Sequence, residues 1–218
     1  MSNILEVDHT NMIFVKGSPF LFSENHEVTL SDYYIGQFPV TGKLWKIVMD
    51  GDILSNFSKD RYNYPVVNIS WKDIKENFLP KLNKKIIESS SESMIFRLPS
   101  EAEWEYSARG GKYSVKDLGY VGNNLDNNVI NNLHIDSKPV GQNSKNKLGI
   151  QDIFENVWEW CEDAWQEDLT KIPKNGLPWK DIKAQYRVFR GGPNFTPRNY
   201  CEPMLHNFLL GFRLVCTK

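Results

Sequence analysis

The sequence predicts a single α+β domain that is low in regular secondary structure. Its 218 residues are 40% hydrophobic and 13% aromatic, which is enough to bury one substantial core. Short β-like stretches and a few helical windows are separated by many Gly, Asn and Pro residues, with no long periodic run. The polar segment Ser89–Ser91 leads directly into another strand-like stretch, so we take residues 1–218 as one domain.

Two or three strands are expected between Asn11 and Gly36. Met12–Val15 and His26–Leu30 are β-like, and the turn residues Gly17–Pro19 lie between them. We therefore expect a hairpin or meander to open the domain.

Three helices are predicted from their capping residues. Thr41 and Ser70 each precede apolar residues at helical spacing. Ser100 begins the third helix, with Glu103 placed to close a capping box, and the Gly110-Gly111 pair ends it.

Charge and cysteine content exclude several classes of partner. Lys+Arg number 26 and Asp+Glu 27, a formal net charge of -1, so we expect neither nucleic acid nor a membrane as a partner. No signal-like segment opens the chain, and no window approaches the roughly 20 apolar residues that span a bilayer, which favours a cytoplasmic location. Three cysteines are too few for a disulfide framework, so at least one thiol is free.

The stretch from Tyr113 to Gly149 is polar and rich in Asn. Such a stretch forms turns, and the simpler interpretation is a plain surface loop. The alternative is a calcium site, because carboxylates, Asn side chains and carbonyls are the oxygen ligands of calcium. The oxygen-bearing residues within a short span are Asn124, Asp126, Asn127, Asn128 and Asp136.

The next segment, Asn146–Cys161, reads NKLGIQDIFENVWEWC. It resembles the signature of the formylglycine-generating-enzyme/sulfatase-modifying-factor family, N-x-x-G-L-x-D-M-x-G-N-V-W-E-W. The resemblance extends from Met12 to Leu214 through further blocks in the same order: residues 26–36, 39–49, 65–71, 97–106, 187–192 and 211–214.

The resemblance implies a C-type-lectin-like formylglycine-generating-enzyme fold with buried Trp side chains and structural calcium. Carried over by position, the calcium ligands would be the Asp152 side chain and mainly backbone carbonyls at Ile153, Glu155 and Val157. Glu155 replaces the usual Gly, which accepts a positive φ more readily. A second calcium is expected near Asn127 or Asn128 and Asp136.

Several of these residues have a simpler structural interpretation. Trp158-Glu159-Trp160 fits core packing as well as it fits a calcium site, and Trp71 and Trp104 are expected in the core. His26 and His134 are expected at the surface or in turns, because no Cys, His or carboxylate lies at ligand spacing from them.

The C-terminal block departs from the family's enzymes. The resemblance implies two copper-binding cysteines five residues apart, and these positions hold Thr196 and Cys201; a usual Ser is Pro193. A hydroxyl cannot replace a soft thiolate as a copper ligand, so copper and formylglycine generation are both disfavoured. Cys201 is then a small apolar core residue or, if the protein is an enzyme, its catalytic thiol.

The segment Pro193–Leu210 has only eighteen residues, fewer than form the wall of the substrate groove in the enzymes. The same block is varied in related proteins of diversity-generating retroelements, which suggests a changeable binding face. Its candidate binding residues are Asn194, Phe195, Thr196, Arg198, Tyr200, His206 and Phe208. The alternative for Phe208, Leu209 and Leu210 is a buried strand.

Two functions follow. The first is a calcium-stabilised recognition domain for an unknown protein, peptide or small-molecule ligand, with Pro193–Leu210 as its binding face. The second is an oxidoreductase acting on a cysteine, thiol or peptide substrate through an altered metal site, with Cys201, His206 and Glu202 as the reactive side chains.

Overall fold

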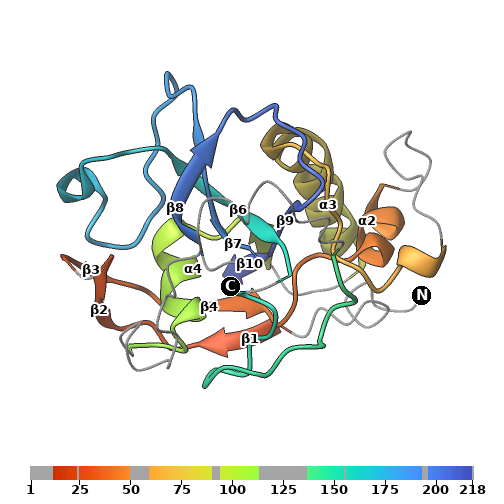
Figure 1. Ribbon diagram of the computed structural model, residues 1–218, viewed down its shortest axis with the longest axis horizontal. Helices are drawn as coiled ribbons and strands as arrows, with labels where there is room; N and C mark the ends of the chain where they lie inside the picture. The colour runs from red at the N-terminus through yellow and green to blue at the C-terminus, as the bar shows by residue number, and fades with distance from the viewer. Residues whose placement is uncertain are drawn as a thin grey trace, which may run out of the picture.

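The computed structural model describes residues 12–23, 25–49, 59–89, 94–112, 137–154, 156–192 and 196–217, with the side chains of Thr196 and Pro197 left outside this description. Helices and strands alternate with long irregular connections (Figure 1). The predicted α+β class is confirmed. None of the helices within these residues is both long enough and apolar enough to cross a membrane.

The first sheet joins the beginning and the end of the described chain. Its strand order is β1-β4-β10-β5, all antiparallel, with β1 (Met12–Val15), β4 (Tyr33–Gly36), β10 (Val215–Thr217) and β5 (Ile95–Arg97). β10 therefore lies between strands from far earlier in the chain. These pairings are non-local and close the domain around its C-terminal residues.

The N-terminal strands differ from the expected pattern in their pairing. Between residues 12 and 36 the structure has four strands, because β2 (Pro19–Phe22) begins where a turn was predicted and pairs with β3 (His26–Thr29). β1 instead pairs with β4, with Val15 opposite Tyr33. The Gly17–Pro19 segment is therefore not a hairpin turn between the two predicted strands, and it leads into a strand of its own.

The second sheet carries the candidate site. Its order is β8-β7-β6-β9, formed by β8 (Thr196–Cys201), β7 (Arg187–Gly191), β6 (Trp158–Ala164) and β9 (Leu210–Phe212). β7 runs antiparallel to β6 and β8, while β9 is parallel to β6. The motif WEWC thus forms the start of a central strand.

Two of the predicted capping residues, Thr41 and Ser100, lie at the starts of helices in the structure. Thr41 accepts a hydrogen bond from the Leu44 N–H at the start of α2 (Gly42–Val48). Ser100 and Glu103 form the predicted capping box of α4 (Glu101–Ala108), which ends before Gly110 and Gly111, both at positive φ. Short 3₁₀ turns occur at η2 (Lys59–Arg61) and η5 (Leu169–Lys171).

The helix expected after Ser70 is not a regular α-helix throughout. A π-helical segment, η3 (Asp73–Phe78), precedes α3 (Leu79–Ser89). Pro80 explains the wider turns, because it has no N–H to donate and its ring would meet the Glu76 carbonyl in a regular helix.

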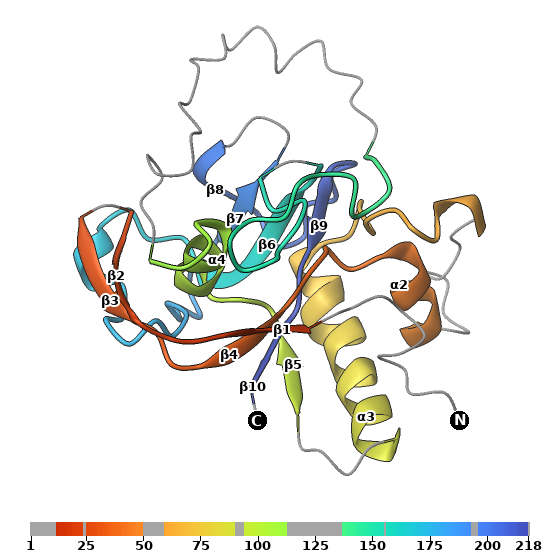
Figure 2. The same cartoon turned by 90° about the horizontal axis from the view of Figure 1, so that it is seen from below.

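The core consists of two hydrophobic clusters, one on each face of the second sheet, with α3 and α4 on opposite sides (Figure 2). Trp45 stacks on Phe78 with ring centroids 4.9 Å apart on the α3 side. Trp104 packs in the cluster on the α4 side. Side chains that alternate along β6, β7 and β8 therefore enter two different environments.

Candidate functional site

The residues proposed for the binding face divide between the two faces of β8. Tyr200 pairs with Val188, and Cys201 with Arg187, in the antiparallel register of β7 and β8. Because neighbouring side chains on a strand point to opposite faces, Arg198 and Tyr200 share the α4 side and Cys201 lies on the α3 side. The predicted binding residues therefore do not form one continuous patch around Cys201.

Arg198 is engaged by the protein itself. Its Nε and Nη2 donate to the two carboxylate oxygens of Glu101 at 2.6 and 2.8 Å, and its Nη1 donates to the Gln166 carbonyl at 3.0 Å. Glu101 also accepts from Arg190 at 2.7 Å. This buried network fixes β7 and β8 to the first turn of α4.

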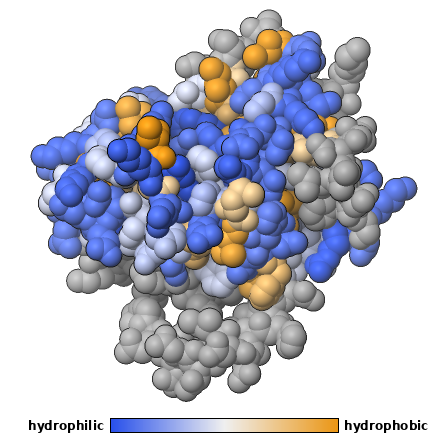
Figure 3. Space-filling view, turned by 90° about the horizontal axis from the view of Figure 1, so that it is seen from above, coloured by the Kyte–Doolittle hydropathy of each residue, from blue (hydrophilic) through white to orange (hydrophobic). Residues whose placement is uncertain are grey.

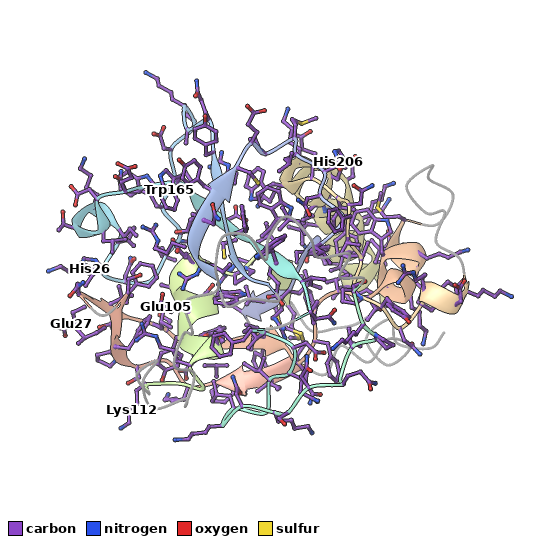
Figure 4. All side chains as sticks on the ribbon, in the orientation of Figure 1. His26, Glu27, Glu105, Lys112, Trp165 and His206 are labelled. Carbon is purple, nitrogen blue, oxygen red and sulfur yellow. The ribbon has the colours of Figure 1, made fainter. Side chains whose placement is uncertain are left out.

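Tyr200 belongs to a group of aromatic rings that sequence reasoning missed. Its ring centroid lies 4.3 Å from that of Trp165 and 5.0 Å from that of Tyr186. The Arg198 guanidinium lies 4.7 Å from the Trp165 ring. Figure 4 shows Trp165 beside β8, on the side away from His206. Trp165 follows the family motif by only a few residues, but nothing local in the sequence pairs it with Tyr200.

Cys201 occupies the α3 side of β8. Its side chain is half-buried and packs against the hydrophobic cluster there. Burial raises the pKa of this thiol to about 12, and the neighbouring Glu202 carboxylate adds to the shift. A thiol with so high a pKa is protonated at neutral pH, whereas the nucleophile and the metal ligand is the thiolate.

Arg187 is the residue paired with Cys201 across β7 and β8, so the two side chains share one face of the sheet. Its guanidinium lies 4.5 Å from the Trp71 ring, and Lys75 lies on the same ring at 5.7 Å. Lys75 is paired with both oxygens of Glu162, at 2.7 and 2.8 Å. In the sequence, Arg187 belongs to a block that resembles the family, and nothing local there indicates a role for it.

The loop after Cys201 lies against the start of the helix that follows Ser70. The Lys72 N–H donates to the Pro203 carbonyl, and His206 Nε2 lies 3.0 Å from the Asp73 carboxylate. Phe208 is 62% exposed, whereas Leu209 and Leu210 are buried. The buried-strand alternative is therefore correct for Leu210, which begins β9, and only its burial holds for Leu209, which lies in the turn before the strand. The alternative is wrong for Phe208, which lies in the same turn and is exposed.

The predicted calcium segment is held by amide donors in this structure. The Asp152 carboxylate accepts N–H groups from Gly141 at 2.5 Å and from Asn143, whose side-chain amide lies at 2.8 Å. The Val157 carbonyl accepts the Gly192 N–H, and Ile153 is buried. N–H donors therefore reach both Asp152 oxygens in this structure.

Other predicted site residues lie outside the described residues, so their structure adds nothing to these predictions. They are Asn128, Asp136 and Glu155 of the calcium set, Asn194 and Phe195 of the binding set, His134, and the side chain of Thr196. Among the described residues, no group of three or more His, Cys, Asp and Glu side chains could hold a metal ion.

Two simpler interpretations can be compared with the structure. The core interpretation of the Trp158–Trp160 block fits, because Glu159 is fully buried, pairs with Arg213 at 2.9 Å and accepts the Trp104 indole N–H at 2.7 Å. The surface position expected for His26 is wrong. His26 is only 8% exposed, and its Nε2 is hydrogen-bonded to the Ile172 carbonyl of a distant loop.

The fold and this sheet define a class of protein, and comparisons with known proteins identify it. The chain matches the sulfatase-modifying factor enzyme 1-like domain over residues 3–218. It is 32% identical to the chaperone protein LppX of Paenibacillus barcinonensis, over 76% of this chain and 78% of the relative. It is 30% identical to a formylglycine-generating enzyme of Thermomonospora curvata, over 66% of this chain and 48% of the enzyme.

Solved structures agree. Treponema denticola variable protein 1 superposes with a TM-score of 0.71 and 26% identity, over 94% of each chain. The chain therefore belongs to the sulfatase-modifying factor enzyme 1-like family. The match covers about half the length of the Thermomonospora enzyme, so the activity of that whole enzyme is not transferred to this chain.

Proposed function

We propose that this protein is a recognition domain of the sulfatase-modifying factor family that does not generate formylglycine. Its ligand would bind at the side of the second sheet formed by β8 and the loop that follows it. Calcium is a further part of this proposal.

The state of Cys201 carries the proposal. It is the single cysteine of the two expected copper positions, and burial raises the pKa of its thiol to about 12. Linear copper(I) coordination by two soft thiolates requires two cysteines, and here one of the two positions is Thr196. The chemistry of the enzymes thus lacks its ligand set.

The exposed surface supports recognition. The loop after β8 exposes Met204, Leu205 and Phe208, at 55%, 42% and 62%, and Tyr200 is 40% exposed at the end of the strand. Figure 3 shows apolar side chains as separate patches on a mostly hydrophilic face of the molecule. Large apolar and aromatic side chains at a surface are typical contact residues for a partner.

The names of two relatives point the same way. One relative is called a chaperone protein and the structural neighbour a variable protein, and neither name denotes an oxidase. A protein or peptide ligand is therefore the favoured class.

Calcium would have to compete with the amide donors on Asp152. Asn143 and Gly141 already hold the carboxylate that the family resemblance assigns to the ion. The calcium part of the proposal rests on that resemblance, with Glu155, Asn128 and Asp136 as further ligands.

The test is copper(I) titration with oxygen consumption, using the wild type and Cys201→Ala. We expect neither stoichiometric tight copper binding nor thiol-dependent oxygen uptake by the wild type, and the same melting temperature in both proteins within a few degrees. Tight copper at one equivalent, lost in Cys201→Ala, would make the protein an oxidase and overturn the proposal. Cys161→Ala is the matched control, because Cys161 is fully buried in the other cluster.

A further inference from the structure

Three arginines of this protein lie over tryptophan rings, and one of them lacks a carboxylate. Arg198 lies 4.7 Å from Trp165, Arg190 lies 5.2 Å from Trp104, and Arg187 lies 4.5 Å from Trp71. Arg198 pairs with Glu101, and Arg190 with Glu101 and Glu105. Arg187 has no ion pair with any carboxylate of the described residues.

The contrast extends to every arginine from residue 97 onward. Each of the others has a glutamate partner at hydrogen-bond distance: Arg97, Arg109, Arg190, Arg198 and Arg213. Arg187 is half-buried, and its Nε is shielded from solvent with no hydrogen-bond partner. The Nε atoms of Arg109 and Arg190 are shielded in the same way, but those two guanidiniums have glutamates on their Nη groups. A charged group shielded in this way ordinarily has a partner, because desolvation without one is costly.

We propose that Arg187, supported by Trp71, binds the carboxylate of an acidic side chain of a protein or peptide ligand. This inference rests on the proposed recognition function and assigns the ligand chemistry of its α3-side surface. Because the Arg187 Nε is shielded, the carboxylate would meet the two Nη groups, which present two parallel N–H donors in the plane of the guanidinium. A planar guanidinium matches a carboxylate in this two-point arrangement.

The charges around Arg187 favour a singly charged carboxylate over a phosphate. Lys75, the other cation on the Trp71 ring, is already neutralised by Glu162. Of the two cations on the Trp71 ring, only the Arg187 guanidinium therefore lacks a neutralising carboxylate among the described residues. A phosphate, with up to two negative charges, is usually held by several donors and cations.

The neighbouring surface favours apolar residues beside the acidic one. Trp71 is followed by Lys72, whose N–H donates to the Pro203 carbonyl, so the loop with Met204 and Leu205 begins at the backbone of the residue after Trp71. Both side chains are exposed, at 55% and 42%. An acidic residue flanked by leucines would meet a cation and apolar contacts together.

The experiment follows the Arg187 Nε–H in proton–nitrogen NMR spectra during titration with the peptide acetyl-Leu-Glu-Leu-amide. Arg187→Lys, which lacks this group, assigns the resonance. We expect the resonance to shift with the Glu peptide and the neutral acetyl-Leu-Gln-Leu-amide to bind about tenfold more weakly, as for loss of one charged hydrogen bond. Equal binding of the two peptides, or no shift with either, would overturn the inference.

Two variants locate the effect. Arg187→Gln should remove the preference for the Glu peptide while both peptides retain the weaker affinity. Arg61→Gln is the matched control, because Arg61 also lies over an aromatic ring, 4.6 Å from Tyr64, and it should leave the preference intact. Loss of the preference in Arg61→Gln would place the site elsewhere.

Two further measurements test other possible partners of Arg187, namely phosphate and the Glu202 carboxylate of the protein itself. Inorganic phosphate at equal ionic strength should shift the resonance less than the Glu peptide, and a stronger effect of phosphate would contradict the carboxylate assignment. Glu202→Gln should leave both the resonance and the peptide affinity unchanged. If that variant alone binds the peptide, Glu202 is the partner of Arg187 and the inference fails.

The copper experiment keeps the two proposals distinguishable. A failed peptide titration with no copper binding removes the role of Arg187 and leaves the recognition domain. Stoichiometric copper lost with Cys201 removes the proposed function whatever the titration shows.

Discussion

One basic and one acidic side chain, Arg187 and Asp163, show how burial acts at the scale of single residues. Arg187 is a shielded cation without a carboxylate, and Asp163 is a shielded carboxyl without a cation within ion-pair distance among the described residues. Asp163 is 2% exposed and accepts N–H groups from Glu101 at 2.7 Å and from Trp179 at 2.8 Å. It therefore joins the start of α4 to the loop between β6 and β7.

Asp163 makes stability depend on pH. Burial, with the Glu101 charge as a second cause, raises the pKa of Asp163 from its ordinary 3.8 to about 8. The folded state then binds a proton that the unfolded state releases, so its contribution to stability is complete below pH 3.8 and is lost as pH rises toward 8. The slope from one such group is at most about 1.4 kcal/mol per pH unit.

The free energy of unfolding, measured with denaturant between roughly pH 5 and pH 8, checks this prediction, because the window lies within the shift of the Asp163 pKa. Asp163→Asn should lower stability at every pH, because its amide NH₂ faces one of the two N–H donors, but its stability should fall less steeply with pH. Glu167→Gln, an exposed neighbour, serves as control and should keep the wild-type slope. Parallel curves for Asp163→Asn and the wild type would show that Asp163 is ionised in the folded protein.

At the scale of elements, local signals predicted the starts of the helices and did not predict what the elements contact. Ser100 was identified as a helix cap from the Glu three residues later. Its hydroxyl also donates to the Gly176 carbonyl at 2.7 Å, a contact across 76 residues that no local pattern contains. The pairing of β1 with β4 and the burial of His26 were missed for the same reason.

Ser100→Ala tests the combined role of this cap. The variant leaves the Glu103 N–H and the Gly176 carbonyl without their partner in a fully buried site. We expect a loss of about 2–3 kcal/mol in the free energy of unfolding, the sum of a helix cap and a buried hydrogen bond. Ser144→Ala at an exposed position should change the free energy by less than about 0.5 kcal/mol. A similar small change in Ser100→Ala would mean that water replaces the hydroxyl.

At the scale of the whole molecule, the family motifs predicted the fold, and the two faces of the second sheet decide the site. WEWC, RGG and GFR come together in β6, β7 and β9, where Glu159 and Arg213 form an ion pair that is fully buried. Because side chains alternate along β8, Arg198 pairs with Glu101 on the α4 side of the sheet and Cys201 packs against the hydrophobic cluster on the α3 side. The sequence could identify the block but not this division, because the division depends on the strand register.

Calcium is the remaining prediction for the whole molecule, and calorimetry of the purified protein tests it. If an ion binds at Asp152, calcium at one hundred times its Kd should add about 2.7 kcal/mol of stability over the chelated protein and raise the melting temperature. Asp152→Asn should remove that gain. Because Gly141 and Asn143 already donate to Asp152, an unchanged melting temperature with and without chelator would show that the amide donors alone hold the segment, and calcium would then be struck from the proposed function.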